Sequence, residues 1–201
     1  HLAASSLAGE SVNSPHLYFS NNISAGLSLL DAMLTVGVKK LVFSSTAAVY
    51  GAPDTAPITE ETSQNPINPY GESKLAFERM LRWYDEAYQL RHVNLRCFNT
   101  AGASERYGED HDPETHLIPN ALRVAAAGAG HVDVFGEDYD TSDGTCVRDY
   151  VHVIDLADAH LLVRRLGGEA RALVEGKSNL SIGSGSVLDN LGARVCRRRL
   201  C

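Results

Sequence analysis

Residues 39–45 read Lys-Lys-Leu-Val-Phe-Ser-Ser, a short apolar run that predicts a buried strand of a parallel sheet. The preceding residues 17–36 predict a helix that packs on one side, because apolar side chains recur every three or four positions: Ile23, Leu27, Leu30 and Leu34. Gly37 ends that helix. A helix, a glycine and a buried strand in this order are typical of α/β winding.

The same order of elements repeats downstream. A proline-rich loop over residues 52–69 leads to a second predicted helix at 70–90, with a core-facing stripe formed by Phe77, Leu81, Tyr84 and Tyr88. Residues 92–98 predict the next buried strand, and 99–103 the loop at its carboxyl end. Ligands of open α/β sheets bind at that edge of the sheet.

The pattern changes after residue 103. A polar loop follows, then a predicted helix at 117–127 and a predicted strand at 131–135. A further helix is expected from about Asp155, as its N-cap, to Leu166, and a weak strand at 179–182.

Composition narrows the function classes. The 201 residues are 44% hydrophobic and 21% charged, as in an ordinary globular protein. A net charge of −7 argues against a nucleic-acid or anionic-membrane surface. We find no apolar run long enough to span a bilayer, no signal peptide and no paired cysteine motif among the four cysteines, so we expect a cytoplasmic protein with reduced thiols.

Histidines near residue 111 raise the question of a metal site. His111 and His116 lie in the run His-Asp-Pro-Glu-Thr-His, where Pro113 breaks a helical ligand geometry. No third ligand has a recognisable spacing, so the sequence predicts no metal site.

Tyr70 and Lys74 stand four residues apart at the start of the second predicted helix, so they share one face. A neighbouring ammonium would lower the pKa of the phenol and could make Tyr70 a proton acceptor. The alternative is an accidental spacing between a half-buried ring and a solvated amine. Thr46, at the carboxyl end of the first predicted strand, would meet both residues at one edge of the sheet.

Four stretches resemble, in order and spacing, the motifs of UDP-glucose 4-epimerases, a branch of the extended short-chain dehydrogenase/reductase family. They are residues 43–51 (Phe-Ser-Ser-Thr-Ala-Ala-Val-Tyr-Gly), 68–74 (Asn-Pro-Tyr-Gly-Glu-Ser-Lys), 95–99 (Leu-Arg-Cys-Phe-Asn) and 144–153 (Gly-Thr-Cys-Val-Arg-Asp-Tyr-Val-His-Val). The resemblance implies a Rossmann-like doubly wound parallel sheet that is incomplete at its N-terminal half. Residues 1–103 would form the C-terminal half of the NAD-binding domain. Residues 104–201 would form part of a small α+β region that binds the nucleotide sugar, with about 145–166 returning to the first domain.

The resemblance also implies site residues. Tyr70 would be the catalytic base, Lys74 would hydrogen-bond the nicotinamide ribose of NAD, and Thr46 would bind the sugar oxygen and relay its proton. The other expected NAD contacts are Leu2, Ala3, Asn21 and Phe98, and the other expected UDP-sugar contacts are Asn99, Leu117, Phe135 and Arg148. Three of these have a plain structural alternative: a helix cap for Asn21, a core position for Phe135 and a surface salt bridge for Arg148.

The implied reaction is inversion at C4 of a UDP-hexose through a transient 4-keto sugar. Ala47 and Ala48 stand where dehydratases of the family carry an Asp-Glu pair, which favours epimerisation over elimination of water. A 4-epimerase of a UDP-pentose or UDP-N-acetylhexosamine stays open, as does a non-catalytic truncated remnant. Family members often pair through two long helices, so a homodimer through helices 17–36 and 70–90 is the expected assembly.

The sequence also departs from the family pattern. Ser6 replaces a common lysine, and Cys97 replaces a common aromatic residue near the cofactor. The glycine-rich turn that holds the pyrophosphate of NAD is expected about 70–80 residues before His1, and no stretch of the chain supplies it.

Overall fold

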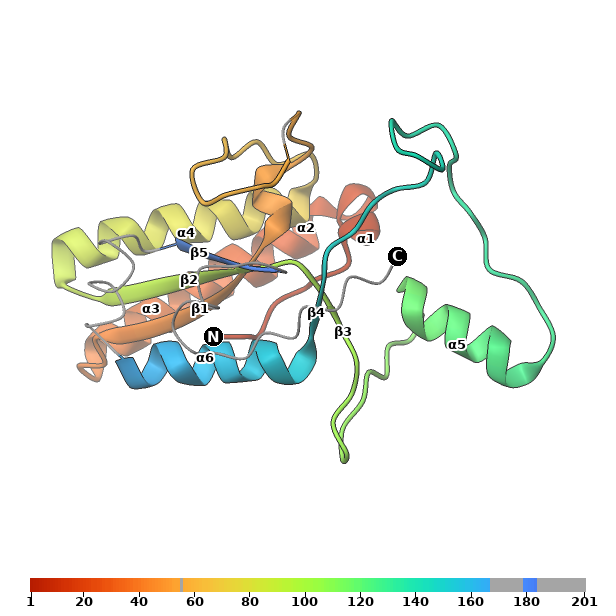
Figure 1. Cartoon of the computed structure of the whole chain (residues 1–201). Coiled ribbons are helices and arrows are strands. Elements are labelled where there is room, and N and C mark those ends of the chain that lie inside the picture. Colours follow the sequence, from red (N-terminus) through yellow and green to blue (C-terminus); the bar gives the residue numbers. More distant parts are fainter. Residues whose placement is uncertain (55, 167–178, 184–201) are drawn as a thin grey trace.

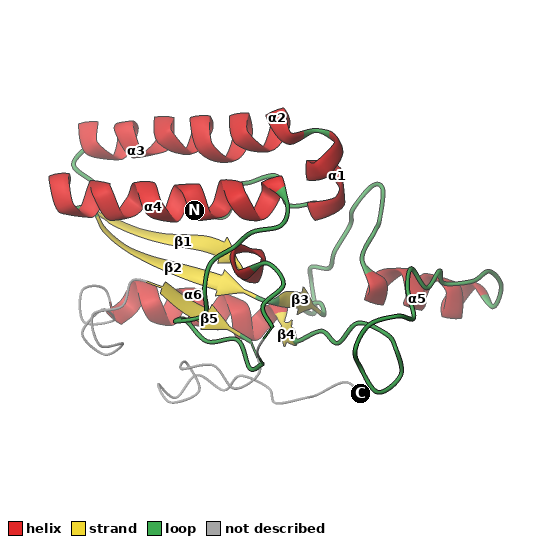
Figure 2. Ribbon diagram, turned by 90° about the horizontal axis from the view of Figure 1, so that it is seen from above, coloured by secondary structure: helices red, strands yellow, loops and turns green. Residues whose placement is uncertain are grey.

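The computed structural model describes residues 1–54, 56–166 and 179–183. At its centre, three parallel strands lie in the order β1-β2-β5: β1 (Lys40–Thr46), β2 (Arg91–Cys97) and β5 (Asn179–Ile182). Helices α3 (Ala25–Thr35) and α4 (Pro69–Tyr88) cover one face, and α6 (Val153–Leu166) covers the other (Figures 1 and 2). The predicted α/β class with a doubly wound parallel sheet is confirmed.

Each face of the sheet has its own apolar core. Phe43 of β1 packs with Leu30, Phe77 and Leu81 under α3 and α4. On the opposite face, Leu95 of β2 belongs to a cluster that takes Ala159 and Val163 from α6. A helix on each face is the reason why these strands read as continuous apolar runs.

The parallel register brings two strand ends to one edge. Lys40 of β1 pairs with Arg91 of β2, and the pairing runs without a bulge to Thr46 opposite Cys97. The N-terminal segment lies beside β1, because the amino group of His1 donates to the carbonyl of Val42 at 2.7 Å and Ser44 N donates to the carbonyl of His1 at 3.1 Å.

A π-helical segment interrupts the helix expected at 17–36. After the short α1 (Ala8–Asn13), the chain runs through α2 (Pro15–Tyr18), the π segment η1 (Phe19–Ser24) and α3. Asn22 of η1 is buried, and its Nδ2 donates to Ser73 Oγ of α4 at 3.0 Å. Asn22 also accepts from the backbone N–H of Ser5 at 2.9 Å and donates to its carbonyl at 3.1 Å. The π segment thereby ties residues 1–7 to α4.

Helix α4 begins and ends with standard capping features. The side chain of Asn68 accepts from Gly71 N at 2.8 Å, Pro69 occupies the first turn, and Gln89 closes the helix in the left-handed conformation. Gly71 packs closely under the short 3-10 helix η2 (Ala47–Tyr50), since a Cβ there would lie 2.6 Å from the carbonyl of Ala48. The start of α4 is therefore held against the end of β1.

Residues beyond β2 depart from the predicted pattern in three places. The expected loop at 99–103 begins as β3 (Asn99–Ala101), which pairs in parallel with β4 (Tyr150–His152). Helix α6 begins at Val153, which places Asp155 in its first turn and not at its N-cap. The expected strand at 131–135 is irregular, and Phe135 is 96% exposed.

Helix α5 (Leu117–Ala127) has the predicted bounds but stands apart from the central sheet (Figure 1). None of its residues is buried. The domain boundary at residue 103 stays a prediction, and residues 184–201 of the expected substrate region lie outside the described residues. No helix in the described ranges combines the length and apolarity that a bilayer span requires.

A buried ion pair joins α4 to the middle of the sheet. Arg96 of β2 is fully buried, and its Nη2 donates to Glu78 Oε2 at 2.6 Å while its Nε donates to Glu78 Oε1 at 3.0 Å. Ser45 Oγ donates to the same carboxylate at 2.5 Å. The other arm of Arg96 donates to the hydroxyl of Tyr50 at 2.9 Å, which in turn lies 2.9 Å from Ser181 Oγ of β5.

We expect Glu78→Ala to lower the free energy of unfolding by about 3–5 kcal/mol, because it leaves the buried guanidinium of Arg96 without its counter-ion. Urea denaturation followed by circular dichroism measures the change. The matched control is Glu86→Ala, which removes an exposed partner of Arg82 at 3.8 Å and should cost less than about 1 kcal/mol. An equal decrease in the free energy of unfolding in both variants would show that the buried pair stabilises the fold no more than the exposed pair does.

Candidate active site

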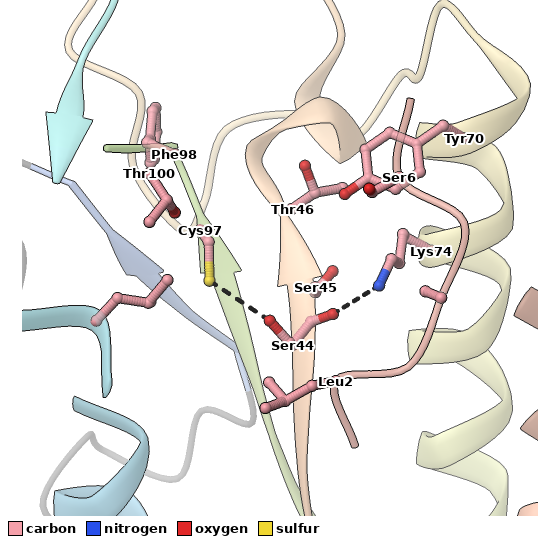
Figure 3. Close-up of a pocket in the computed structure, with 12 residues that line it drawn as sticks. Leu2, Ser6, Ser44, Ser45, Thr46, Tyr70, Lys74, Cys97, Phe98 and Thr100 are labelled. Carbon is pink, nitrogen blue, oxygen red and sulfur yellow. Dashed lines mark hydrogen bonds between the residues drawn. The ribbon is translucent and has the colours of Figure 1, made fainter. Parts of the chain in front are cut away.

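The carboxyl ends of β1 and β2 open into a cavity of about 240 Å³ (Figure 3). Its walls come from the N-terminal segment, β1 and β2, Phe98 just beyond β2, the first turns of α4, and one residue each of β3 and α6. The lining residues are Leu2, Ala4, Ser6, Ser44, Ser45, Thr46, Tyr70, Lys74, Cys97, Phe98, Thr100 and Leu156. The structure therefore brings the three expected catalytic residues into one pocket, together with Leu2 and Phe98.

Tyr70 and Thr46 lie side by side on one wall of this pocket (Figure 3). The Thr46 hydroxyl hydrogen-bonds to the phenol of Tyr70, and it also accepts from Ala48 N at 3.1 Å. Burial raises the pKa of Tyr70, and the hydrogen bond from Thr46 offsets part of that rise. The rings of Tyr18 and Tyr70 pack in a T-shaped arrangement, with centroids 6.3 Å apart.

Lys74 points its ammonium at the backbone and not at the phenol. Its Nζ donates to the carbonyl of Ser44 at 2.8 Å and lies 4.9 Å above the centre of the Phe43 ring. The same nitrogen is 5.9 Å from the centre of the Tyr70 ring. The expectation that this ammonium lowers the pKa of Tyr70 is therefore wrong for this arrangement, in which burial of the phenol dominates.

Burial also shapes the ionisation of the two groups beside Tyr70. It lowers the pKa of Lys74 to about 8, although the nearby Cys97 and Glu78 act in the opposite direction. Burial raises the pKa of the Cys97 thiol to about 11, which keeps this group protonated and a poor nucleophile at neutral pH. Its sulfur lies 3.8 Å from Ser44 Oγ.

The remaining expected cofactor contacts lie outside the lining of the cavity. Ala3 is exposed on the N-terminal segment between the lining residues Leu2 and Ala4. Asn21 lies inside η1, so it does not cap a helix, and its Nδ2 donates to Ser5 Oγ at 3.0 Å.

The expected substrate residues other than Thr46 are not gathered at the cavity. Asn99 donates to the carbonyl of Asp149 at 3.0 Å, and Arg148 donates to the carbonyl of Val147 at 2.9 Å. Leu117 begins α5 and is 57% exposed, and the exposed Phe135 is not a core residue. Their roles in binding the UDP-sugar stay predictions.

Sequence reasoning missed several wall residues of the pocket. The carbonyl of Ser44 holds Lys74, and Thr100 and Leu156 approach from β3 and α6. Ser44 could have been found from its place two residues before Thr46, since alternate residues of a strand share a face. Leu156 gave no such signal, because it is far from the motifs in sequence.

Comparison with known proteins places this geometry in a family. A model of the NAD dependent epimerase/dehydratase family matches residues 1–174. The chain belongs to this family.

Individual relatives agree with that assignment. The chain is 50% identical over 203 residues to a UDP-glucose 4-epimerase of Halalkalibacterium halodurans, covering 98% of this chain and 59% of the relative. It is 56% identical over 164 residues to the UDP-glucose 4-epimerase of Lactobacillus helveticus, covering 81% of this chain and 50% of the relative. The chain thus spans about half the length of the curated relatives that it matches.

Solved structures show the same fold. The UDP-glucose 4-epimerase of Brucella ovis in complex with NAD is 49% identical, with a TM-score of 0.80 over 91% of this chain and 56% of that one. The Bifidobacterium longum enzyme in complex with NAD+ and UDP is 42% identical, with a TM-score of 0.82 over 92% of this chain and 56% of that one.

We expect a lysine side chain that titrates near pH 8 in the folded protein, because burial disfavours the charged form of Lys74. NMR titration of lysines labelled with 13C at Cε measures this pKa, and the signal should vanish in Lys74→Met. If the signal that is lost in Lys74→Met titrates above pH 10 in the unmodified chain, burial does not lower the pKa of Lys74.

Proposed function

We propose that this chain forms part of an enzyme that inverts the configuration at C4 of a UDP-hexose, with UDP-glucose and UDP-galactose as the two sugars. The observation that carries the proposal is the single pocket that holds Thr46, Tyr70 and Lys74 at the carboxyl edge of the sheet. Its support from relatives is the set of UDP-glucose 4-epimerases at about 50% identity. Activity of the whole enzyme needs the half of its length that this chain does not span.

The residues of the pocket have distinct roles in this proposal. Tyr70 accepts the proton of the sugar 4-hydroxyl, and Thr46, hydrogen-bonded to the same phenol, holds the sugar oxygen and relays the proton. The 4-keto sugar then turns over in the site, and the proton returns to its oxygen as the new configuration forms. The raised pKa of Tyr70 opposes loss of its proton. A positive charge must therefore approach the phenol before Tyr70 can act as the base.

The pocket fits one end of NAD. A cavity of about 240 Å³ is smaller than ligand pockets in general, which hold about 300–1,000 Å³, so it suits a nicotinamide ring with its ribose and not the whole dinucleotide. Among the described residues that line this cavity, Lys74 is the one basic side chain, and it would hydrogen-bond the ribose hydroxyls. Leu2 and Phe98 offer apolar surface to the ring. When bound, NAD supplies the acceptor and donor of hydride at C4, so no net oxidation occurs.

Epimerisation is favoured over dehydration at this site. Ala47 and Ala48 form the first turn of η2, directly beyond Thr46. Among the described residues that line the cavity, none carries a carboxyl group that could protonate a leaving hydroxyl. Elimination of water therefore lacks its acid.

We also infer a cytoplasmic location, because both cysteines in the described ranges, Cys97 and Cys146, are free thiols, as in a reducing compartment.

The activity is tested in a complete enzyme. This chain replaces the matching segment of the Halalkalibacterium halodurans relative, and turnover of UDP-galactose to UDP-glucose is measured. We expect Tyr70→Phe to lower kcat by at least about 100-fold, because it removes the proton acceptor.

Tyr84→Phe serves as the control and should leave kcat unchanged, since that hydroxyl bonds to Asp31 at 3.1 Å and Tyr84 does not line the cavity. Unchanged turnover in Tyr70→Phe would remove Tyr70 from the mechanism. A panel of UDP-pentoses and UDP-N-acetylhexosamines separates the alternative substrates, and a chimera that is inactive on all of them would favour the non-catalytic remnant.

We propose that the complete enzyme is a homodimer through α3 and α4, which lie side by side on the same face of the sheet (Figure 2). Both helices expose large apolar side chains, with Leu27 of α3 40% exposed and Trp83 of α4 58% exposed. Exposed apolar side chains of this size favour contact with the surface of another subunit.

We expect Trp83→Glu to convert the chimera from a dimer to a monomer, because it places a charge in the buried centre of the interface. Sedimentation velocity measures the change. The exposed Tyr107 of the loop after β3 provides the control, since Tyr107→Glu should leave the dimer intact. A Trp83→Glu variant that remains dimeric would exclude this face.

A further inference from the structure

Two Glu-x-His pairs meet in the segment that leads into α5, which stands apart from the central sheet (Figure 1). The first pair is Glu109 and His111, and the second is Glu114 and His116. One ligand atom of each side chain, a carboxylate oxygen or an imidazole nitrogen, lies within 4.8 Å of those of the other three. We call these four residues the Glu-His cluster.

Short direct contacts join the four side chains of the cluster. His116 Nδ1 lies 2.7 Å from Glu114 Oε1 and 2.9 Å from Glu109 Oε1. Glu109 Oε1 is in turn 2.8 Å from His111 Nδ1. The two imidazole rings tilt toward each other with centroids 5.0 Å apart.

Hydrogen bonds alone do not satisfy this arrangement. An imidazole nitrogen carries either one proton or one lone pair, so His116 Nδ1 can donate to only one of the two carboxylates in good geometry. The two carboxylates also repel each other across that nitrogen. A cation between the four groups would remove both conflicts.

Glu114 gives an independent sign of a missing partner. Its side chain is only 1% exposed, although the other three members of the cluster remain 30–46% exposed. Its Oε1 accepts from His116 N at 2.8 Å, whereas its Oε2 is buried and has no hydrogen-bond partner. A buried carboxylate oxygen without a partner is costly, and a bound cation supplies the missing interaction.

We propose that the Glu-His cluster binds one divalent transition-metal ion of the Zn²⁺ type. Two imidazoles and two carboxylates are ligands that Zn²⁺ accepts, and the two carboxylates balance its charge. With metal–ligand bonds of about 2.0–2.2 Å, neighbouring ligand atoms lie about 3.0–3.4 Å apart, so the observed contacts need to open by only a few tenths of an ångström.

The proposed ion would fix the start of α5. His116 immediately precedes Leu117, the first residue of that helix, and Glu109 belongs to the preceding loop. An ion held by both would fasten this loop to the helix, which otherwise has no buried residue. The ion therefore has a structural role, and none of its four ligands is among the residues that line the cavity of Thr46, Tyr70 and Lys74.

Metal binding is tested on the 201-residue chain, without a histidine tag and without NAD or sugar, so the result does not depend on the proposed epimerase activity. Zn²⁺ is titrated in competition with a chromophoric chelator, and we expect one ion per chain. His116→Ala and Glu114→Gln should each weaken the affinity at least about ten-fold, because each removes one of four ligands. Zn²⁺ should also raise the melting temperature of the unmodified chain and not that of His116→Ala.

His131→Ala is the matched control, since His131 pairs with Asp133 at 3.3 Å outside the cluster and is 84% exposed. It should leave the affinity unchanged. Co²⁺ reports the ligand type, and its spectrum should lack the strong charge-transfer band of a thiolate ligand.

Any of three results would overturn the proposal: no binding above that of His131→Ala, binding that survives both cluster variants, or a cobalt–thiolate band. Circular dichroism verifies that each variant is folded. If one of the cluster variants is not folded, His111→Ala, at an exposed loop position, takes its place.

Discussion

The buried ion pair between Glu78 and Arg96 is the constraint on which the arrangement of the site depends. Two charges removed from water are tolerated only when they are paired and their other hydrogen-bonding groups are satisfied. Here Ser45 and Tyr50 complete the set. Glu78 lies one helical turn beyond Lys74, and Ser45 directly precedes Thr46. The interaction that joins α4 to the sheet therefore also sets the distance between the residues that would transfer the proton.

The central layers could be predicted from sequence, and the region beyond β2 could be predicted only in part. Helix α4 and strands β1 and β2 follow their predicted ranges within about two residues, because a buried helix face and a buried strand have distinct periodicities. The predicted strand at 131–135 failed although its residues alternate. An apolar alternation becomes a strand only where a neighbouring strand accepts its hydrogen bonds, and no described strand lies beside it.

The site shows the same division. Thr46, Tyr70 and Lys74 could be placed together because their spacing and the order of elements fix one sheet edge. The direction of the Lys74 ammonium could not be predicted from sequence. It is set by the backbone carbonyl of Ser44, and any residue at that position would provide such a carbonyl. The sequence predicted no metal site at the Glu-His cluster, because Pro113 breaks a helical ligand geometry and no third ligand has a recognisable spacing. Pairs two residues apart in an irregular segment have no helical signature, so only the folded chain reveals them.

The π segment η1 has a consequence for how this site can change. A π turn arises where a helix holds one residue more than regular α geometry requires. That surplus residue places Asn22 between Ser5 and Ser73, and so supports the wall formed by Leu2, Ala4 and Ser6. Loss of one residue in this segment would let the helix continue as a plain α-helix, with Leu30 and Met33 still in the core. Insertion and deletion at η1 would therefore remodel the pocket wall without disturbing the fold, which makes chain length here a means of evolutionary tuning.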